Sequence, residues 1–398
     1  LRMSRGLGDV YKRQQQKPVY LDATKPIEER VEDALGRLTL KEKVAMTHAQ
    51  SKFSSPGVPR LGIPEFWMTD GPHGIRPEVL WDEWNQAGWT NDSCVAYPAL
   101  TCLAATWNPE MSLLYGKSIG EEARYRNKTV LLGPGVNIYR TPLNGRNFEY
   151  MGEDPYLASR MVVPYIQGVQ QNGVAACVKH FALNNQEINR HTLNVIVDDR
   201  ALYEIYLPAF KAAVQEGKAW AIMGAYNLYK GQHACHNQYL LNDILKGEWG
   251  FDGVVVSDWG GTHDTDQAIT NGLDMEFGSW TNGLSNGASN AYDNYYLAMP
   301  YLQRIQEGKA GTKELDDKVR RILYGGLGEK SVICNECVLA SYNMLVESGD
   351  IKPGRAPSAV SDSKSEFISN GSELMKPEEI KAYLDQYIIG QDEAKKIL

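Results

Sequence analysis

The chain has 398 residues, of which 43% are hydrophobic and 23% are charged, and its formal net charge is −8. This composition is ordinary for a globular protein. The acidic balance and the lack of a long basic run make a nucleic-acid partner unexpected. No apolar run approaches the roughly 18 residues of a membrane span, so we expect no membrane partner either.

The N-terminal residues and the cysteines bear on the compartment. The first residues lack the apolar core of a secretory signal. The six Cys are scattered except for Cys334 and Cys337, which suits a reducing compartment better than a disulfide framework. We therefore expect a cytoplasmic protein. Residues 1–19 lack periodicity and are predicted to be a disordered or artefactual head, in which residues 1–14 resemble translated sequencing-adapter sequence.

From residue 20 onwards, helical and strand patterns alternate. Residues 26–38 place apolar side chains on one helical face, and Thr39-Leu-Lys-Glu42 is a capping box that opens a second helix. Further helices are predicted over residues 111–127, 157–171, 200–216, 240–248 and 292–307. Strands are predicted over residues 66–69, 129–132, 174–178, 220–223, 254–256 and 273–275. This alternation predicts a mostly parallel sheet, for which a (β/α)8 TIM barrel is the default.

Polar residues stand at the ends of four predicted strands. They are Asp70, the pair Lys179 and His180, Tyr226 and Asp258. The carboxyl ends of barrel strands share one mouth, where such folds keep their chemistry, so we expect these side chains to meet. Taken alone, Asp258 could be a structural carboxylate and Tyr226 a core residue. The recurrence of polar residues at strand ends favours a site.

Two loop arginines, Arg146 and Arg190, are candidates for the same mouth. Lys179 and His180 would be costly in a core unless each were paired, but around a polyol they are natural donors. The two oxygens of Asp70 can accept from adjacent hydroxyls. The nine Trp and 22 Tyr suit sugar stacking, although they suit any core or interface as well.

Several motifs carry a family resemblance. Residues 20–323 resemble the barrel domain of glycoside hydrolase family 3, β-glucosidase type. The motifs are Thr69-Asp-Gly-Pro-His-Gly74, Gly133-Pro-Gly-Val-Asn-Ile-Tyr-Arg140, Pro142-Leu-Asn-Gly-Arg-Asn-Phe-Glu149, Glu153-Asp-Pro155, Val178-Lys-His-Phe181, Asn184-Asn-Gln-Glu187, Met223-Gly-Ala-Tyr-Asn227, Trp249-Gly-Phe-Asp-Gly253 and Val256-Ser-Asp-Trp259.

The resemblance implies a retaining glycosidase that acts on β-linked glucosides or oligosaccharides, needs no cofactor, and uses Asp258 as nucleophile. Cationic neighbours are expected to keep Asp258 ionised. The resemblance also implies which residues line the sugar-binding −1 subsite. They are Asp70, Arg146, Lys179, His180, Arg190, Tyr226 and Trp259.

The acid/base partner is the unresolved half of this mechanism. A retaining enzyme needs a second carboxyl group about 5 to 5.5 Å from the nucleophile. In the β-glucosidase branch, the resemblance implies a Glu from an α/β-sandwich domain that follows the barrel, a covalent partner in intact relatives. Another branch uses a His after Lys-His-Phe-Pro-Gly-His-Gly, but here Ala182 to Asn185 follow Phe181. Nothing assigns the role to Glu149, Glu153 or Glu187, so we expect impaired turnover.

The chain changes character after residue 324, and we expect a small, mostly helical or disordered tail. We divide it into a half zinc-domain fragment (325–349), a linker (350–373) and the truncated start of an AAA+ module (374–398). Residues 328–398 resemble a ClpX-type AAA+ unfoldase, a family that binds zinc through two Cys-x-x-Cys pairs. Only Cys334 and Cys337 are present, so a zinc site would need other ligands, and no phosphate loop follows.

Two alternatives to a glycosidase remain open at this point. The first is a non-catalytic sugar-binding barrel, because the barrel lacks an assigned acid/base. The second is a ClpX-like zinc or adaptor fragment, fused to the barrel by a chimeric reading frame. The second alternative accounts for only the tail.

Overall fold

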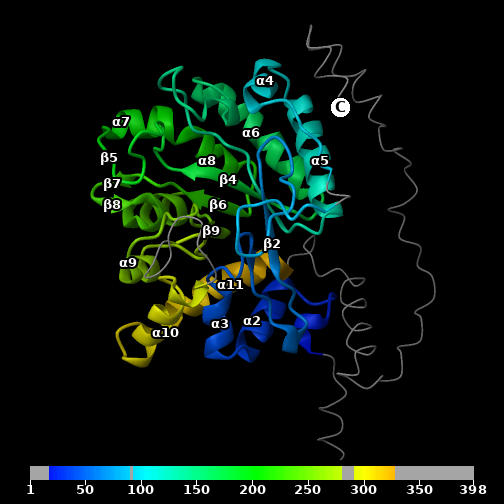
Figure 1. The fold of residues 1–398 in the computed structure, drawn as a ribbon, viewed down its shortest axis with the longest axis vertical. Helices are drawn as coiled ribbons and strands as arrows, with labels where there is room; N and C mark the ends of the chain where they lie inside the picture. The colour runs from blue at the N-terminus through cyan, green and yellow to red at the C-terminus, as the bar shows by residue number, and fades with distance from the viewer. Residues whose placement is uncertain (1–17, 90–92, 280–290, 328–398) are drawn as a thin grey trace, which may run out of the picture.

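The computed structural model describes residues 18–89, 93–279 and 291–327 (Figure 1). The predicted head before residue 18, the zinc-type pair Cys334 and Cys337, the linker and the AAA+-like segment lie outside the described residues.

A curved sheet of mostly parallel strands forms the centre of the molecule. Its six strands stand in the order β1-β2-β3-β4-β6-β9, and only the β1–β2 pair is antiparallel. Two isolated parallel bridges, Val256 with Met275 and His48 with Glu276, then join β9 to the segment before β1. The strands are β1 (Ser54–Ser55), β2 (Phe66–Asp70), β3 (Val130–Leu132), β4 (Ala175–Phe181), β6 (Ala221–Gly224) and β9 (Val254–Val256). The fold is therefore mixed α/β, and this closure is compatible with a barrel.

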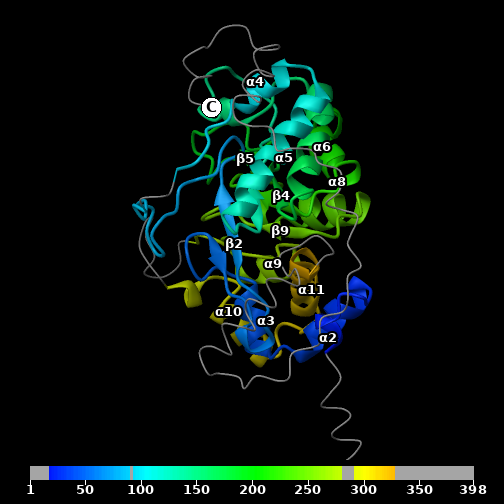
Figure 2. The same ribbon diagram turned by 90° about the vertical axis from the view of Figure 1, so that its right-hand side faces the viewer.

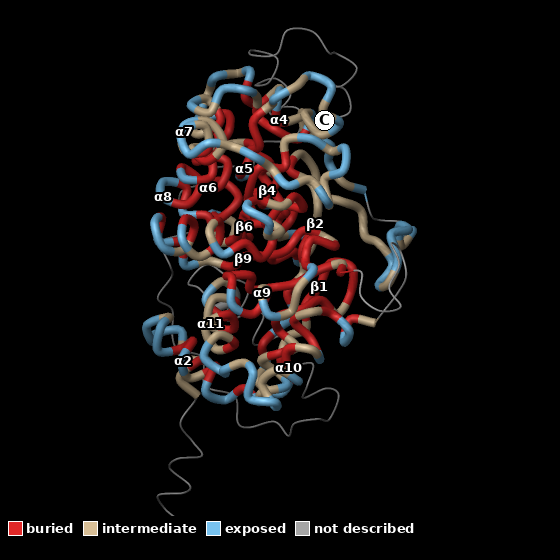
Figure 3. The backbone as a smooth tube through the Cα atoms, turned by 90° about the vertical axis from the view of Figure 1, so that its left-hand side faces the viewer, coloured by how far each residue is buried: buried red, intermediate tan, exposed pale blue. Residues whose placement is uncertain are grey.

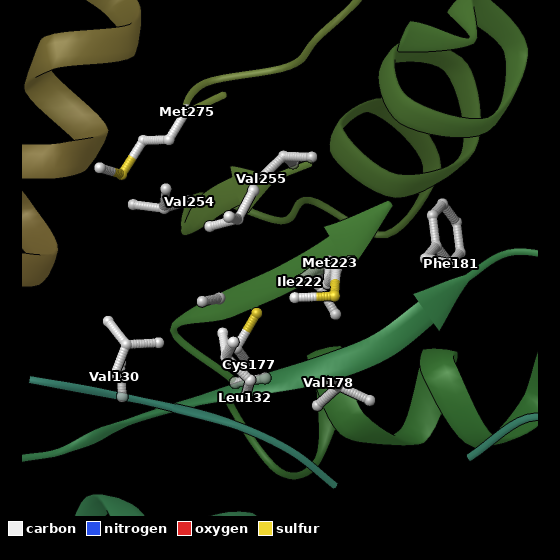
Figure 4. Packing of buried hydrophobic residues seen from close by; sticks show 14 of the residues in the cluster. Val130, Leu132, Cys177, Val178, Phe181, Ile222, Met223, Val254, Val255 and Met275 are labelled. Atoms are coloured by element: carbon white, nitrogen blue, oxygen red, sulfur yellow. The ribbon is translucent and has the colours of Figure 1, made fainter. Parts of the chain in front are cut away.

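The strands form where short apolar runs allow burial on both faces. All seven residues of β4 and all three of β9 are buried, as parallel strands covered by helices must be. Side chains from neighbouring strands, among them Leu132, Cys177 and Ile222, gather between them (Figure 4). Buried residues follow the strands and the inner faces of the helices (Figure 3).

Three helices cover one side of the sheet, α5 (Pro109–Tyr125), α6 (Pro155–Gln170) and α8 (Pro208–Gln215) (Figures 1 and 2). Facing glycines let α5 and α6 approach closely. A Cβ atom on Gly116 would lie 2.1 Å from the Tyr165 carbonyl oxygen, and one on Gly168 would lie 2.4 Å from that of Leu113. A side chain at either position would push the two helices apart.

A second group of helices packs at the other end of the molecule, where α11 contacts both α2 and α3 (Figure 1). The predicted capping box is present, with Thr39 and Glu42 bonding each other's backbone N–H groups. The group comprises α2 (Ile27–Arg37), α3 (Leu40–Met46), α9 (Thr265–Thr270), α10 (Met299–Gln306) and α11 (Lys313–Leu327).

Shorter elements complete the described chain. A small sheet is formed by β5 (Asn194–Val195), β7 (Leu228–Tyr229) and β8 (Gln232–His233). The remaining helices are α4 (Leu100–Ala105) and α7 (Asp199–Ala201). The 3-10 and π-type turns are η1 (Val19–Leu21), η2 (Pro59–Leu61), η3 (Asn147–Glu149), η4 (Leu202–Tyr206), η5 (Ala234–His236), η6 (Gln238–Glu248) and η7 (Tyr292–Asn294).

Three sequence-based expectations need correction. The predicted helix over residues 200–216 is divided into α7, η4 and α8, because Pro208 lacks an N–H group and starts a new helix. The helix over residues 292–307 is likewise split into η7 and α10, with Pro300 in the first turn of α10. Residues 273–275 form a single bridge at Met275 rather than a strand. In addition, helices α4, α9 and α11 were not predicted.

Among the described helices, none has the length and apolar character needed to cross a bilayer.

Candidate active site

The residues predicted to meet at the strand ends line one cavity of about 520 Å³. Asp70 ends β2, Lys179 and His180 lie in β4, Tyr226 follows β6, and Asp258 follows β9. Loop residues complete the wall. All eight predicted site residues line it, namely Asp70, Arg146, Lys179, His180, Arg190, Tyr226, Asp258 and Trp259.

The two oxygens of Asp258 differ in their surroundings. Oδ1 accepts hydrogen bonds from the Tyr226 hydroxyl at 2.9 Å and from the Trp259 backbone N–H at 2.8 Å. Oδ2 lies 3.5 Å from His180 Nε2 and has no hydrogen-bond partner among the described residues. One oxygen is thus held in place by two donors, and the other is buried without a donor among the described residues.

A cysteine that the sequence analysis did not single out supports the Asp258 backbone. The Asp258 N–H donates to Cys235 Sγ at 3.4 Å, and the thiol donates to the Ala225 carbonyl at 3.3 Å. A Cβ atom on Gly261 would lie 2.5 Å from the same sulfur. The sulfur therefore fits closely between the loops that follow β6 and β9, and nothing in the sequence pattern indicated this.

His180 is held as a neutral imidazole. Arg146 Nη2 lies 2.7 Å from His180 Nε2, and because a guanidinium can only donate, Nε2 must accept. The ring proton is then on Nδ1, which donates to the Tyr150 hydroxyl at 3.1 Å. Burial, with Arg146, Lys179 and Arg190 nearby, lowers the pKa of His180 well below its usual value. This tautomer has no proton to offer a ligand from Nε2.

The buried cations of the site are paired, as their burial requires. Lys179 Nζ donates to Asp70 Oδ1 at 3.0 Å and lies 3.7 Å from Glu149 Oε2. Arg146 forms a short ion pair with Glu149. The four side chains form a network along one wall of the cavity.

Arg190 acts on the site through its neighbours. Its guanidinium pairs with Glu187 and lies 4.3 Å from the centroid of the Tyr226 ring. This contact holds the phenol whose hydroxyl donates to Asp258. Arg190 thus lies in the wall of the cavity and contacts Tyr226, which donates a hydrogen bond to the Asp258 carboxylate.

The cationic neighbours act on Asp258 in the expected direction, but burial opposes them. Burial raises the pKa of Asp258, and this effect exceeds the lowering by Arg146, Lys179 and the hydrogen bonds from Tyr226 and Trp259. The reason is that the carboxylate is 7% exposed and one of its oxygens receives no donor. A ligand that donated to Oδ2 would favour the ionised form.

The other carboxylates near Asp258 are bound to cations. Glu149 pairs with Arg146 and Lys179, and Glu187 pairs with Arg190 and lies 3.9 Å from Arg146. Both glutamates are therefore engaged in ion pairs with cations of the site. Glu153 is exposed and is absent from the described cavity wall.

The sequence analysis did not single out several other residues of the cavity wall, among them Phe53, Trp84 and Arg76. Trp259 donates its indole N–H to the Lys52 carbonyl at 2.7 Å and packs against Phe53. Trp84 follows no predicted strand, so its spacing carried no signal. Within residues 18–89, 93–279 and 291–327, no three His, Cys, Asp or Glu side chains are grouped in a way that could hold a metal ion.

The comparison with protein families decides the classification. Residues 35–324 match the family model described as "Glycosyl hydrolase family 3 N terminal domain". The chain belongs to glycosyl hydrolase family 3. The family resemblance seen in the sequence is thereby confirmed, whereas the resemblances noted for the head and the tail stay predictions.

Most of this chain aligns with the sequences of named members of the family. It is 64% identical over 323 residues to "Beta-glucosidase BoGH3A" of Bacteroides ovatus, covering 81% of this chain and 43% of that protein. It is 40% identical over 295 residues to "Thermostable beta-glucosidase B" of Acetivibrio thermocellus, covering 74% of this chain and 37% of the relative. The chain therefore spans less than half the length of these relatives.

Solved structures of the family have the same fold. Beta-glucosidase 3B from Thermotoga neapolitana in complex with glucose superposes with a TM-score of 0.66 at 33% identity, over 80% of this chain and 46% of that one. The beta-glucosidase from Kluyveromyces marxianus in complex with glucose superposes with a TM-score of 0.64 at 34% identity, over 81% of this chain and 35% of that one.

Proposed function

We propose that this chain is the nucleophile-bearing part of a retaining β-glucosidase that acts on β-linked glucosides or oligosaccharides. The observation that carries the proposal is the Asp258 carboxylate, held through Oδ1 and unpaired at Oδ2 in the wall of a polar cavity. The names of the relatives support the substrate class. We also interpret the sheet and its two closing bridges as a (β/α)8 barrel.

In the proposed first step, Asp258 Oδ2 forms a bond to the anomeric carbon as the glycosidic carbon–oxygen bond breaks. The leaving oxygen takes the electron pair of the broken bond and must receive a proton. In the second step, water gives a proton to a base, bonds to the same carbon and releases the Asp258 carboxylate. Tyr226 and the Trp259 N–H stabilise Oδ1 throughout.

The sugar would bind among the charged groups of the opposite wall. Asp70 and Lys179 are hydrogen-bonded to each other and together offer an acceptor and a donor to neighbouring hydroxyls. Arg146 and Arg190 have further donors. Neutral His180 keeps its Nε2 turned to Arg146, so we assign it to positioning that guanidinium rather than to proton transfer.

In our proposal, the described residues of this cavity do not supply the proton that the leaving group needs. The carboxylates that share the described wall with Asp258 are Asp70 and Glu149, and both are paired with cations. We propose that the acid/base Glu comes from an α/β-sandwich domain, as the family resemblance implies. A chain without that domain would turn over slowly, and would react best with substrates whose leaving group needs no proton.

The test is covalent trapping of the full chain with 2,4-dinitrophenyl 2-deoxy-2-fluoro-β-glucoside, followed by intact-mass and peptide mass spectrometry. The leaving group needs no acid, and the fluorine slows hydrolysis of the adduct. We expect one fluoroglucosyl group on the peptide that contains Asp258, and none in the matched variant Asp258→Asn. Folded wild-type protein that stays unlabelled at Asp258 would remove the nucleophile assignment.

A second function, a non-catalytic sugar-binding barrel, is favoured by the cation-bound state of Glu149 and Glu187. The same trapping experiment separates the two functions when it is paired with calorimetric titration of glucose. Glucose binding without an adduct would support the binding protein, whereas an adduct on Asp258 would exclude it.

A further inference from the structure

The loop that starts at Asp258 is held by two neighbouring side chains of η5. This short helix follows β8 and contacts α9, at the left of Figure 1. Cys235 Sγ accepts from the Asp258 backbone N–H at 3.4 Å, and His236 Nε2 accepts from the His263 backbone N–H at 3.1 Å. The two side chains therefore fix both ends of the segment 258–263.

His236 makes its contacts as one tautomer of the neutral imidazole. A backbone N–H can only donate, so Nε2 must accept and carries no proton. The ring proton is then on Nδ1, which donates to Gln267 Oε1 on α9 at 3.1 Å. A proton added to Nε2 would place one donor against another, and the His263 N–H would lose its acceptor. The bond to the loop therefore exists only while His236 is neutral.

Two further imidazoles surround His236 and oppose a positive charge there. His233 stacks on His263 with ring centroids 3.8 Å apart and an interplanar angle of 23°, and its Nδ1 donates to the Tyr226 carbonyl at 3.1 Å. The ring centroids of His233 and His236 are 5.7 Å apart. A charge on one ring disfavours a charge on the next. Burial, with His233 nearby, lowers the pKa of His236 to about 4.

Charged and titratable groups face these three histidines from two sides. At the start of α9, the Asp264 carboxylate favours a protonated His236, but it also caps the helix by accepting from a backbone N–H at 2.8 Å. On the side of the cavity stands His191, with Arg190 and Glu187 close to it, and it disfavours a charge on the stacked imidazoles. The single acid that favours the charge therefore opposes burial and the neighbouring imidazoles.

We propose that His236 is a positioning residue for the nucleophile, because its neutral imidazole fixes the loop that starts at Asp258. Protonation of His236 releases the His263 N–H, and the loop then no longer holds the Asp258 carboxylate at its bond with Tyr226. The inference rests on the proposed function and deepens it, because it adds a second group whose protonation slows the reaction. Two protons, one on Asp258 and one on His236, then govern the acidic limb of the trapping rate.

The test follows fluoroglucoside trapping of the full chain from pH 3.5 to 7 in wild type, His236→Gln and His236→Phe. Gln keeps an acceptor near the position of Nε2 but cannot be protonated there, whereas Phe removes the acceptor at every pH. With a pKa of about 4, His236 is about three-quarters protonated at pH 3.5. The trapping rate at pH 3.5 relative to pH 7 should therefore be roughly fourfold higher in His236→Gln than in wild type. At pH 7, His236→Phe should trap roughly 2- to 10-fold more slowly than His236→Gln, since it lacks one hydrogen bond.

The matched control is His48→Gln. His48 is also buried, its Nδ1 donates to the Ala49 carbonyl at 2.8 Å, and it is absent from the described cavity wall. Burial lowers the pKa of His48 as well, so the control removes a neutral imidazole of the same kind away from the site. Its acidic limb should match that of wild type. Thermal unfolding at each pH restricts the comparison to folded protein.

The outcomes separate the inference from the proposed function. A higher relative rate at pH 3.5 in His236→Gln, with none in His48→Gln, supports the inference. An unchanged limb in His236→Gln, the same change in both glutamine variants, or equal rates of His236→Phe and His236→Gln at pH 7 would overturn it, while labelling of Asp258 keeps the proposed function. Wild-type protein that is never labelled at Asp258 overturns both.

Discussion

Two buried aspartates of this protein, Asp258 and Asp274, show opposite uses of the same side chain. Asp274 is fully buried, and its oxygens accept from Lys246, from Arg321 and from the Val255 backbone N–H at distances of 2.7 to 3.1 Å. Asp258 is nearly as buried but leaves Oδ2 without a hydrogen-bond donor among the described residues.

The pKa values of the two aspartates are shifted in opposite directions, as their different hydrogen bonding suggests. Burial alone would raise the pKa of both. At Asp274 the cations Lys246, Arg321 and Lys318 outweigh burial and lower the pKa, whereas at Asp258 burial prevails and raises it. A fully satisfied buried carboxylate ties elements together, and an incompletely satisfied one keeps binding capacity for a ligand. Burial by itself therefore says little about which aspartate is functional.

The largest expected effect is on the chemistry at Asp258. Asp258→Asn should reduce the rate of fluoroglucoside trapping by roughly 10³-fold or more, because an amide is a poor nucleophile. The melting temperature of the variant should equal or exceed that of wild type, because the substitution removes an incompletely satisfied buried charge. Trapping rates and calorimetric melting would be compared, and a strongly destabilised Asp258→Asn would contradict the comparison of the two aspartates.

The converse change at Asp274 should act on stability. Asp274→Ala leaves the half-buried Lys246 and Arg321 without their carboxylate, so we expect a loss of up to about 3 to 5 kcal/mol in the free energy of unfolding. Urea denaturation would measure this loss. Arg304→Ala is a suitable control, because its ion pair with Asp266 is on the surface and should contribute about 1 kcal/mol or less. Similar losses of stability in Asp274→Ala and Arg304→Ala would contradict the expected difference between the buried carboxylate and the surface ion pair.

A substitution at Tyr226 tests how much the hydrogen bond to Asp258 Oδ1 contributes to the trapping rate. Tyr226→Phe keeps the ring beneath Arg190 but removes the 2.9 Å hydrogen bond to Oδ1. A hydrogen bond to a charged group is worth about 1.5 to 3 kcal/mol, which predicts a roughly 10- to 100-fold slower trapping rate. Because the hydroxyl lowers the pKa of Asp258, the acidic limb of the pH–rate profile should also move to higher pH. An unchanged limb would mean that the bond does not act on the reacting carboxylate.

The wild-type pH dependence should separate the two aspartates. The raised folded pKa of Asp258 means that trapping falls as the pH drops through a value above the usual 3.8, since the carboxylate must be ionised to attack. The lowered folded pKa of Asp274 means that its contribution to stability is present above about pH 3.8 and is lost only as the pH falls further, through that lowered pKa. Trapping and melting would be followed from pH 3 to 7. Parallel loss of both would contradict this order.

The smallest expected effect per pH unit concerns the lysines around Asp274. Burial lowers the pKa of Lys318 to about 7 and that of Lys246 to about 8, below their unfolded value of 10.5. Between about pH 7 and pH 10 the unfolded chain then binds more protons, so stability should rise with pH, by at most about 1.4 kcal/mol per unit for each lysine. Lys318→Met should flatten this rise in melting curves. A steeper rise in the variant would be evidence against the assignment.

The sequence predicted the elements whose side chains follow a simple period, and it missed those set by tertiary contact. The strand ends at Asp70, Tyr226 and Asp258 could be read because an apolar run stops at a polar residue. The break at Pro208 could have been read from proline alone, yet the strong helical pattern around it concealed it.

The unexpected members of the site lie where no local pattern points. Cys235 supports the Asp258 backbone, and Trp84 reaches the cavity from a projecting segment, through folding of distant parts of the chain. The pKa of Asp258 depends on tertiary structure in a similar way. Counting neighbouring cations predicts that they lower this pKa, but it does not predict the larger, opposite effect of burial.

The closing of the sheet has a mechanical consequence. Two single bridges, at Met275 and Glu276, join β9 to the segment before β1, and several backbone hydrogen bonds cross the same join. Asp274 strengthens the join, because its carboxylate accepts from the Val255 backbone N–H. The ion-paired aspartate therefore also fastens the closure of the sheet, and we expect Asp274→Ala to loosen the sheet at this join before it opens at β4. Phe277, the residue after the join, packs on Trp259, so the aromatic side of the cavity would loosen while the charged wall on β4 stays in place.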